Sequence, residues 1–382
     1  MRKRSANNLM IMAVLLTLTI SISYGRSMTL VYGGMELLLA AWCYVILLCR
    51  WRKTDPYLLL FFCAVTLFSL FNGLLAGEVK SVVLLSISLV LPLSVSALPL
   101  NLNENGRTFR TAYFVGLILC ALQQVMALFG EFNANTLGFL NYMCVSVGFV
   151  WYLCSRKKLV PALVLLAGFS LAVAAGSRNV MVVTALTILL LLLPKRWYAG
   201  KSFFRVLYLL VLLYTVFAAA VMEWGFNVRF IAHWLQEYTG RYSDKAWEMS
   251  QRVTFLHRVR EIIAQMSPLQ KLFGEGILLR HGHNMFYQTV MIYGYLGTVL
   301  IYAFYIRIFE MARTLIARSG DRIALGCAIA LLGCFMINGA DVFLVGTETC
   351  AVIPQVLMGV IIYRYRDSDE NLTQRVKAHE RN

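Results

Sequence analysis

The chain has 382 residues, of which 59% are apolar and 14% are charged, and it contains only 7 Pro. An ordinary soluble protein is roughly half apolar and about a quarter charged, so this composition excludes a soluble multidomain enzyme and a disordered chain. The apolar residues form continuous rather than alternating segments, which excludes a transmembrane barrel. We therefore expect an all-α, polytopic membrane protein, because helices satisfy their own backbone hydrogen bonds in lipid.

The net charge of +16 does not indicate a nucleic-acid partner, because the basic residues stand in short runs between apolar segments. The nine Cys lie in or beside apolar segments without CxxC spacing, which indicates small apolar side chains rather than metal ligands. The basic start at Arg2 and the apolar stretch after it resemble a signal peptide without a cleavage site. We expect this stretch to be the first transmembrane helix.

Twelve apolar segments predict twelve transmembrane helices. At about 20 residues per span, they use about 240 residues and leave room for one extra-membrane element. In chain order the segments are 9–23, 28–49, 57–76, 81–98, 111–130, 136–154, 159–175, 179–194, 204–222, 286–306, 323–338 and 347–363.

Lysine and arginine are distributed unequally between alternate loops. Alternation places 24 of them on one side, whereas the short loops of the other side hold only Arg26, Lys80 and Arg178. Because cytoplasmic loops are enriched in Lys and Arg, we expect both termini to be cytoplasmic.

One long segment, 223–285, separates the ninth and tenth helices and is expected to face the periplasm. The predicted organisation is a membrane domain of nine helices over 1–222, this outer loop, three helices over 286–363 and a loosely ordered cytoplasmic tail over 364–382. Within the loop, 246–266 predicts an amphipathic helix that lies on the membrane or covers a cavity. Its apolar positions at helical spacing are Leu256, Val259, Ile263 and Met266.

The outer loop is rich in Arg and His, which favours an anionic substrate, because guanidinium groups bind phosphate oxygens in pairs and stay charged. No Walker sequence is present. Asp367 and Asp369 have the spacing of a metal-binding DxD pair, but they fall in the tail and are interpreted as a solvated turn. His281 and His283 lack an evident third ligand, so we expect neither a metal nor a cofactor.

Four separated motifs occur in a characteristic order. His283-Asn284 is followed after nine residues by Gly294 and after two more by Gly297. The others are Gly176-Ser177-Arg178, Gln251-Arg252 and Gly339-Ala340-Asp341. Together with twelve spans and a large loop between the ninth and tenth, they resemble the O-antigen ligase and polymerase superfamily. These are bacterial transferases of undecaprenyl-diphosphate-linked glycans.

The resemblance implies that His283 is the base that accepts the proton of the acceptor hydroxyl, and that Arg178 and Arg252 hold the donor diphosphate. The chemistry is reasonable, because a neutral imidazole activates a weak nucleophile and guanidinium groups stabilise the departing anion without a metal. Attack opposite the diphosphate would invert the anomeric centre. Further substrate-binding candidates are Arg258, Arg241, Asn284, His281, Arg280 and Asp341.

Each assignment has a purely structural explanation as well. His283 is also suited to cap the tenth helix, and Arg178 to extend toward lipid headgroups. Arg252 and Arg258 have partners at ion-pair spacing in Glu248 and Glu261. Gly294 and Gly297 favour close helix packing over substrate contact.

The sequence thus predicts a metal-independent, inverting glycosyltransferase of the bacterial inner membrane. Its partners are an undecaprenyl-diphosphate-linked glycan, an acceptor and membrane lipid, with no nucleic acid. With lipid A–core as acceptor the protein is an O-antigen ligase, whereas with a second lipid-linked repeat unit it is a polysaccharide polymerase. The motif spacing favours the ligase. The sequence is also compatible with a protein O-glycan transferase and, less well, with a transporter of lipid-linked glycans.

Overall fold

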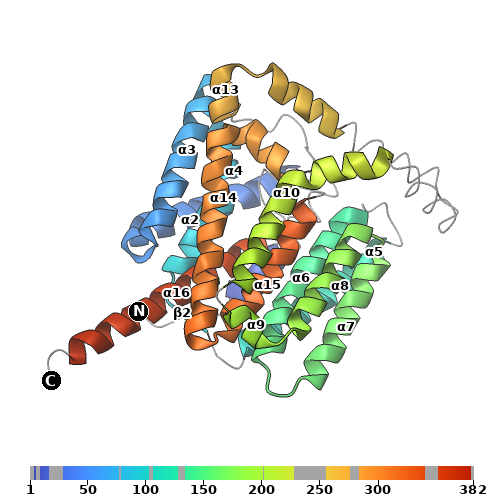
Figure 1. The fold of residues 1–382 in the computed structure, drawn as a ribbon, viewed down its shortest axis with the longest axis vertical. Coiled ribbons are helices and arrows are strands. Elements are labelled where there is room, and N and C mark those ends of the chain that lie inside the picture. Colours follow the sequence, from blue (N-terminus) through green and yellow to red (C-terminus); the bar gives the residue numbers. More distant parts are fainter. Residues whose placement is uncertain are drawn as a thin grey trace, which may run out of the picture.

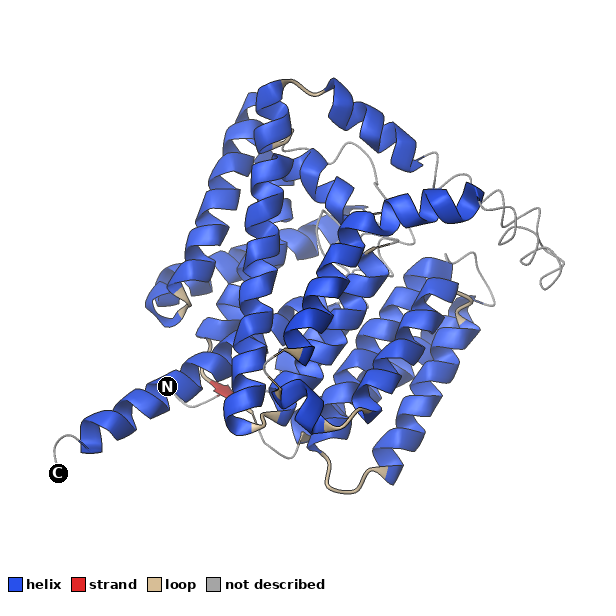
Figure 2. Ribbon diagram, in the orientation of Figure 1, coloured by secondary structure: helices blue, strands red, loops and turns tan. Residues whose placement is uncertain are grey.

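The computed structural model describes residues 4–5, 9–16, 29–76, 79–102, 106–127, 134–200, 202–227, 255–275, 284–339 and 352–379. Almost all of these residues are helical, which confirms the all-α class (Figure 2). The strands β1 (Arg4–Ser5) and β2 (Leu100–Asn101) pair in parallel.

Thirteen α-helices of the described fold are labelled in Figure 1. Residues 9–16 and 255–265 are also helical, and η1 (Trp51–Lys53) is a 3-10 turn. The labelled helices are α2 (Thr29–Arg50), α3 (Pro56–Ala76), α4 (Val79–Ala97), α5 (Arg107–Ala127), α6 (Ala134–Cys154), α7 (Leu159–Ala174), α8 (Arg178–Leu192), α9 (Lys195–Ala199), α10 (Phe203–Asn227), α13 (Pro268–Phe273), α14 (Met285–Ser319), α15 (Arg322–Asn338) and α16 (Val352–His379).

Each predicted apolar segment coincides with or overlaps a helical part of the described chain. Within the described ranges, three helices are long and apolar enough to cross a membrane, namely Arg107–Ala127, Leu137–Cys154 and Met285–Ser319. Six further apolar helices have 10–17 residues. Many large apolar side chains point outward, such as Leu48 on α2 and Leu159 on α7. These helices are compatible with a membrane protein.

Helix α15 is the centre of the fold, and it contacts α6, α8, α10, α14 and α16. It is apolar all round, as expected for a fully buried helix. Glycine permits its close approach to α6: a Cβ at Gly326 would lie 2.7 Å from the Val150 Cα. The Tyr142 hydroxyl of α6 donates a hydrogen bond of 2.9 Å to the Ala330 carbonyl.

The predicted cytoplasmic loops gather at one end of the bundle, which we call the basic end. Arg307 of α14 pairs with Asp55 before α3 at 3.0 Å. Arg364 of α16 pairs with Asp321 before α15 at 2.7 Å. Burial and the nearby Lys195 and Arg322 lower the pKa of Lys158, so residues 155–158 and the loop at Lys195 also meet here.

Both terminal segments reach the basic end. Arg4 pairs with Leu100 through β1 and β2. The hydroxyl of Tyr363 on α16 donates to the Leu100 carbonyl at 2.7 Å. Both terminal segments lie at the same end of the bundle, which is consistent with an even number of helices that cross it.

Several predictions about individual segments are wrong. The tail is not loosely ordered through its described part, because α16 continues to His379. Asp367 and Asp369 lie within this helix rather than in a turn, and Asp369 pairs with Arg318 at 3.3 Å. The tail extends α16 because residues 364–379 contain neither Pro nor Gly, and because Arg364 is held by Asp321.

Two helices are longer than expected. The tenth predicted helix, 286–306, is part of α14, which runs to Ser319 with non-helical backbone angles at Gly294. Likewise, α10 continues beyond residue 222 to Asn227. These extensions contain polar residues, so the predicted apolar segments end before the observed helices do. A helix does not require apolar residues in order to continue.

The eight described Cys are all free thiols. Six of them are buried, whereas Cys49 and Cys63 are exposed.

Candidate functional site

Asn284 joins three helices at the end of the bundle opposite the basic end, which we call the site end. Its side chain is fully buried. Its Nδ2 donates to the Thr215 carbonyl of α10 at 2.9 Å and to the Gly339 carbonyl after α15 at 2.8 Å. Its Oδ1 accepts the Tyr287 backbone N–H at 3.1 Å and so caps α14. The start of α14 is therefore fixed to α10 and α15.

Gly339 is required where α15 ends. A Cβ at this position would lie 2.3 Å from Cε1 of Tyr214 on α10. The neighbouring Thr215 hydroxyl shares a 2.5 Å hydrogen bond with the Tyr302 hydroxyl of α14. Side-chain contacts thus reinforce the backbone contacts that Asn284 makes at the site end.

The turn between α7 and α8 brings the Gly176-Ser177-Arg178 motif to the same end. Gly176 has a φ of +74°, which glycine adopts without strain. Ser177 is buried against α6, where a Cβ at Gly138 would lie 2.6 Å from the Ser177 Cβ. Asn179, in the first turn of α8, donates from Nδ2 to the Ile337 carbonyl of α15 at 3.3 Å. The start of α8 is therefore fixed to the last turn of α15.

The amphipathic helix predicted in the outer loop is confirmed over its described part, residues 255–265. Val259, Ile263 and Met266 are buried against Val290 and Met291 of α14. The fourth predicted apolar position, Leu256, is also buried. This helix therefore covers the first turns of α14.

Helix α13 continues from this amphipathic helix and returns the chain to α14. Ser267 and Gln270 form a reciprocal capping box, with Pro268 in the first helical position. The ring of Phe273 packs on Phe68 of α3, with 5.1 Å between ring centroids. The backbone N–H of Glu275 then donates to the Met291 carbonyl at 3.0 Å. Burial raises the pKa of the Glu275 carboxyl.

Glu275 and Asn284, the described residues on either side of 276–283, both form hydrogen bonds with the first turns of α14. About 10 Å of helix separates Asn284 from Met291. The segment carries Arg280, His281 and His283.

The predicted site residues fall into three groups. Arg178 is the first residue of α8, and its backbone lies at the site end. Asn284 lies there too, but both hydrogens of its Nδ2 and its Oδ1 are engaged within the protein. Arg258 lies on the exposed face of the 255–265 helix. The remaining candidates lie outside the described residues: His283, Arg252, Arg241, His281, Arg280 and Asp341.

The structure tests some of the purely structural explanations that the sequence offered for the candidate residues. Arg258 and Glu261 are both exposed, and no ion pair within 4.0 Å joins them among the described contacts. Asn284, not His283, provides the side-chain cap of α14. The close packing expected at Gly294 is confirmed, with the end of α13 as its neighbour. At Gly297 an added Cβ would instead lie 2.5 Å from the Tyr293 Cβ of the same helix.

Sequence reasoning did not select Asn179, Thr215 or Gln288. Asn179 and Thr215 bond the backbones of helix ends together, and Gln288 is fully buried one turn after Asn284. The available signal was the presence of polar side chains inside apolar segments, because such residues join helices or serve function in a membrane.

The geometry of the site end suits an anionic group. The first turns of α8 and α14 both lie here, and helix N-termini carry positive partial charge. Arg178 adds a basic residue at the first position of α8, which has no acidic residue in its first turn. In the described part of the chain, no group of three or more His, Cys, Asp or Glu is placed to hold a metal ion.

No family model matches the chain, and no curated protein is significantly similar to it in sequence.

Proposed function

We propose that this protein is an O-antigen ligase-type glycosyltransferase of the bacterial inner membrane. It transfers a glycan from undecaprenyl diphosphate to a hydroxyl of lipid A–core on the periplasmic side. The observation that carries the proposal is the 2.8 Å hydrogen bond from Asn284 to the Gly339 carbonyl. It joins two of the four motifs that resemble the ligase and polymerase superfamily.

A third motif is joined to the same place. Asn179 follows Arg178 directly and bonds the Ile337 carbonyl, two residues before Gly339. Separate apolar helices have no general reason to present these motifs at one end of a bundle. A common site supplies that reason.

The proposed reaction uses residues that flank these contacts. The acceptor oxygen attacks the anomeric carbon while the bond from that carbon to the diphosphate oxygen breaks. His283, which precedes Asn284 in the chain, takes the hydroxyl proton. Arg178 and the positive end of α8 stabilise the charge on the leaving diphosphate. The attack comes from the opposite face, so the anomeric centre is inverted.

The twelve-span arrangement is part of the proposal. It is supported by the match between predicted apolar segments and observed helices, by outward-facing Leu and Val side chains and by the gathering of basic loops at one end. In a bacterial inner membrane the basic end faces the cytoplasm, and the site end then faces the periplasm.

A transporter of lipid-linked glycans is less consistent with the charges. Transporters place charged groups and broken helices near the bilayer midplane. In the described residues, the ion pairs lie at the basic end, including those of Glu310 with Arg205 and Arg313, each at 2.7 Å.

The proposal is tested by replacing His283. The purified full-length protein is reconstituted with lipid-linked donor and lipid A–core, in the presence of EDTA and without nucleotide. We expect wild-type protein to transfer glycan, and His283→Ala to lose transfer while keeping its melting temperature. His379→Ala, in the tail helix, is the matched control and should remain active. Normal transfer by His283→Ala, or a requirement for a divalent ion, would contradict the mechanism.

A further inference from the structure

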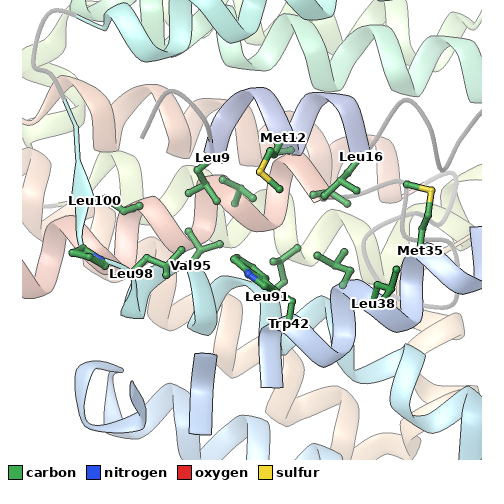
Figure 3. A pocket seen from close by; sticks show the side chains of 15 residues that line it. Leu9, Met12, Leu16, Met35, Leu38, Trp42, Leu91, Val95, Leu98 and Leu100 are labelled. Carbon is green, nitrogen blue, oxygen red and sulfur yellow. The ribbon is translucent and has the colours of Figure 1, made fainter. Parts of the chain in front are cut away.

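An apolar cavity of about 590 Å³ lies between the 9–16 helix, α2, α4 and α16. Figure 3 shows side chains of the 9–16 helix, including Met12 and Leu16, across from Leu38 and Trp42 of α2. The cavity extends past Val95 of α4 to the residues that follow this helix. It lies apart from the contacts of Asn284 at the site end.

The walls of the cavity are hydrocarbon and aromatic, because every lining residue is apolar. A cavity of this kind offers few polar partners for water and instead accepts apolar molecules. Its volume is in the range of small-molecule binding sites. Met12 and Leu38 line it and are 55% and 73% exposed, so the cavity opens sideways toward the surroundings of the bundle.

One end of the cavity lies beside basic residues. Leu98 and Leu100, which line it, directly follow the end of α4. Arg366 of α16 donates from Nη1 to the Ser96 carbonyl at 2.9 Å and also to the Lys53 carbonyl. These contacts place η1, the turn that holds Lys53, next to this end of the cavity.

The η1 turn is both aromatic and basic. Trp51 is 54% exposed, and Arg52 and Lys53 are exposed as well. Arg50 donates from Nη1 to the Ala97 carbonyl at 3.3 Å, which adds another cation at the same place. The acidic groups nearby are Asp55, which is paired with Arg307, Glu370, which lies 3.6 Å from Arg366, and Asp367, which lies near Tyr363.

We propose that this cavity binds an acyl chain of an anionic phospholipid, and that Arg52 and Lys53 bind its phosphate. The apolar walls match the chain, and the excess of positive charge at one end matches the headgroup. Tryptophan and basic residues beside an apolar surface are typical of the membrane interface, and basic clusters there attract anionic lipid. The bound lipid fills the space between the 9–16 helix and the bundle.

The proposal is tested by native mass spectrometry of the full-length protein in detergent, with phosphatidylglycerol or phosphatidylcholine carrying the same acyl chains. We expect wild-type protein to retain one phosphatidylglycerol under activation that removes phosphatidylcholine. Leu38→Trp and Met12→Trp place an indole at the opening, and each should reduce retention at least five-fold. Leu163→Trp, at an exposed apolar position of α7, is the control and should retain lipid like the wild type.

The headgroup is tested separately. Arg52→Gln with Lys53→Gln should remove the preference for phosphatidylglycerol, whereas Arg156→Gln with Lys157→Gln, at exposed positions of another basic loop, should keep it. Unchanged retention by both tryptophan variants would overturn the cavity assignment. An unchanged preference in the Arg52 and Lys53 variant, or displacement of the lipid by inorganic phosphate alone, would overturn the proposed phospholipid site.

Discussion

Gly274 and Gly294 lie backbone against backbone where α13 ends and α14 departs from helical geometry. A Cβ at Gly274 would lie 2.2 Å from the Ile292 carbonyl oxygen, and one at Gly294 would lie 2.4 Å from the Leu272 carbonyl oxygen. Both residues have positive φ, at +81° and +68°. This contact connects the end of α13 to α14, the helix that begins at the candidate site.

The first prediction concerns this glycine contact. Gly294→Ala should destabilise the protein by more than about 2 kcal/mol. Alanine is strained at positive φ, and its Cβ would also clash with backbone atoms of α13. A clearly lower melting temperature in detergent is the expected result. Gly34→Ala, on α2 with nothing within 4 Å of the added Cβ, is the control. Equal melting temperatures for the two variants would show that the contact is not this tight.

The second prediction distinguishes a buried helix cap from an ordinary one. Asn284→Ala should cost about 2–4 kcal/mol, because a cap and two buried hydrogen bonds are lost. Asn284→Asp should cost at least as much, since its carboxylate would face the carbonyl oxygens of Thr215 and Gly339. Thermal unfolding measures both effects.

Ser267→Asp provides the matched comparison. Asp is as good an N-cap residue as Asn or Ser, and Ser267 is an exposed cap, so this variant should be nearly neutral. A stable Asn284→Asp variant would mean that the donor contacts of Asn284 contribute little.

The third prediction concerns Arg178. Arg178→Lys should lower glycan transfer at least ten-fold without changing the melting temperature, because an ammonium cannot reproduce a two-pronged phosphate contact. The reconstituted transfer assay measures the effect, with Arg156→Lys at the basic end as the control. Full activity of Arg178→Lys would leave Arg178 as an interfacial anchor.

The fourth prediction concerns orientation. Single cysteines introduced at Ser243 and Gln270 should react with a membrane-impermeant maleimide added outside spheroplasts. Cysteines at Lys157 and Lys201 should react only after permeabilisation. The reverse pattern would put the site end in the cytoplasm and exclude a periplasmic transferase.

The fifth prediction distinguishes the acceptors. Deletion of the gene for a ligase leaves lipid A–core bare, while long chains accumulate on undecaprenyl diphosphate. Deletion of a polymerase gene leaves core lipid with a single repeat unit. We expect the first pattern on lipopolysaccharide gels, and the second would assign the same residues to polymerisation.

Local sequence patterns specified the helices and several of their faces. Continuous apolar segments predicted most helix positions because a buried or lipid-facing helix needs apolar side chains along its length. Val259, Ile263 and Met266 showed the buried face of the outer-loop helix through their spacing. Gly294 was correctly interpreted as a packing residue. Each of these inferences depends on neighbours within a few residues of the chain.

How the helix ends meet depends on packing between segments that are far apart in the chain. The same Asn284 side chain would contact substrate on an open surface, but it is buried between α10 and α15 and bonds carbonyls 69 and 55 residues away. Asp369 lies in a helix rather than a turn, with Arg318 as its partner. Local composition does not specify such partners, because burial and hydrogen bonding depend on which distant segments pack together.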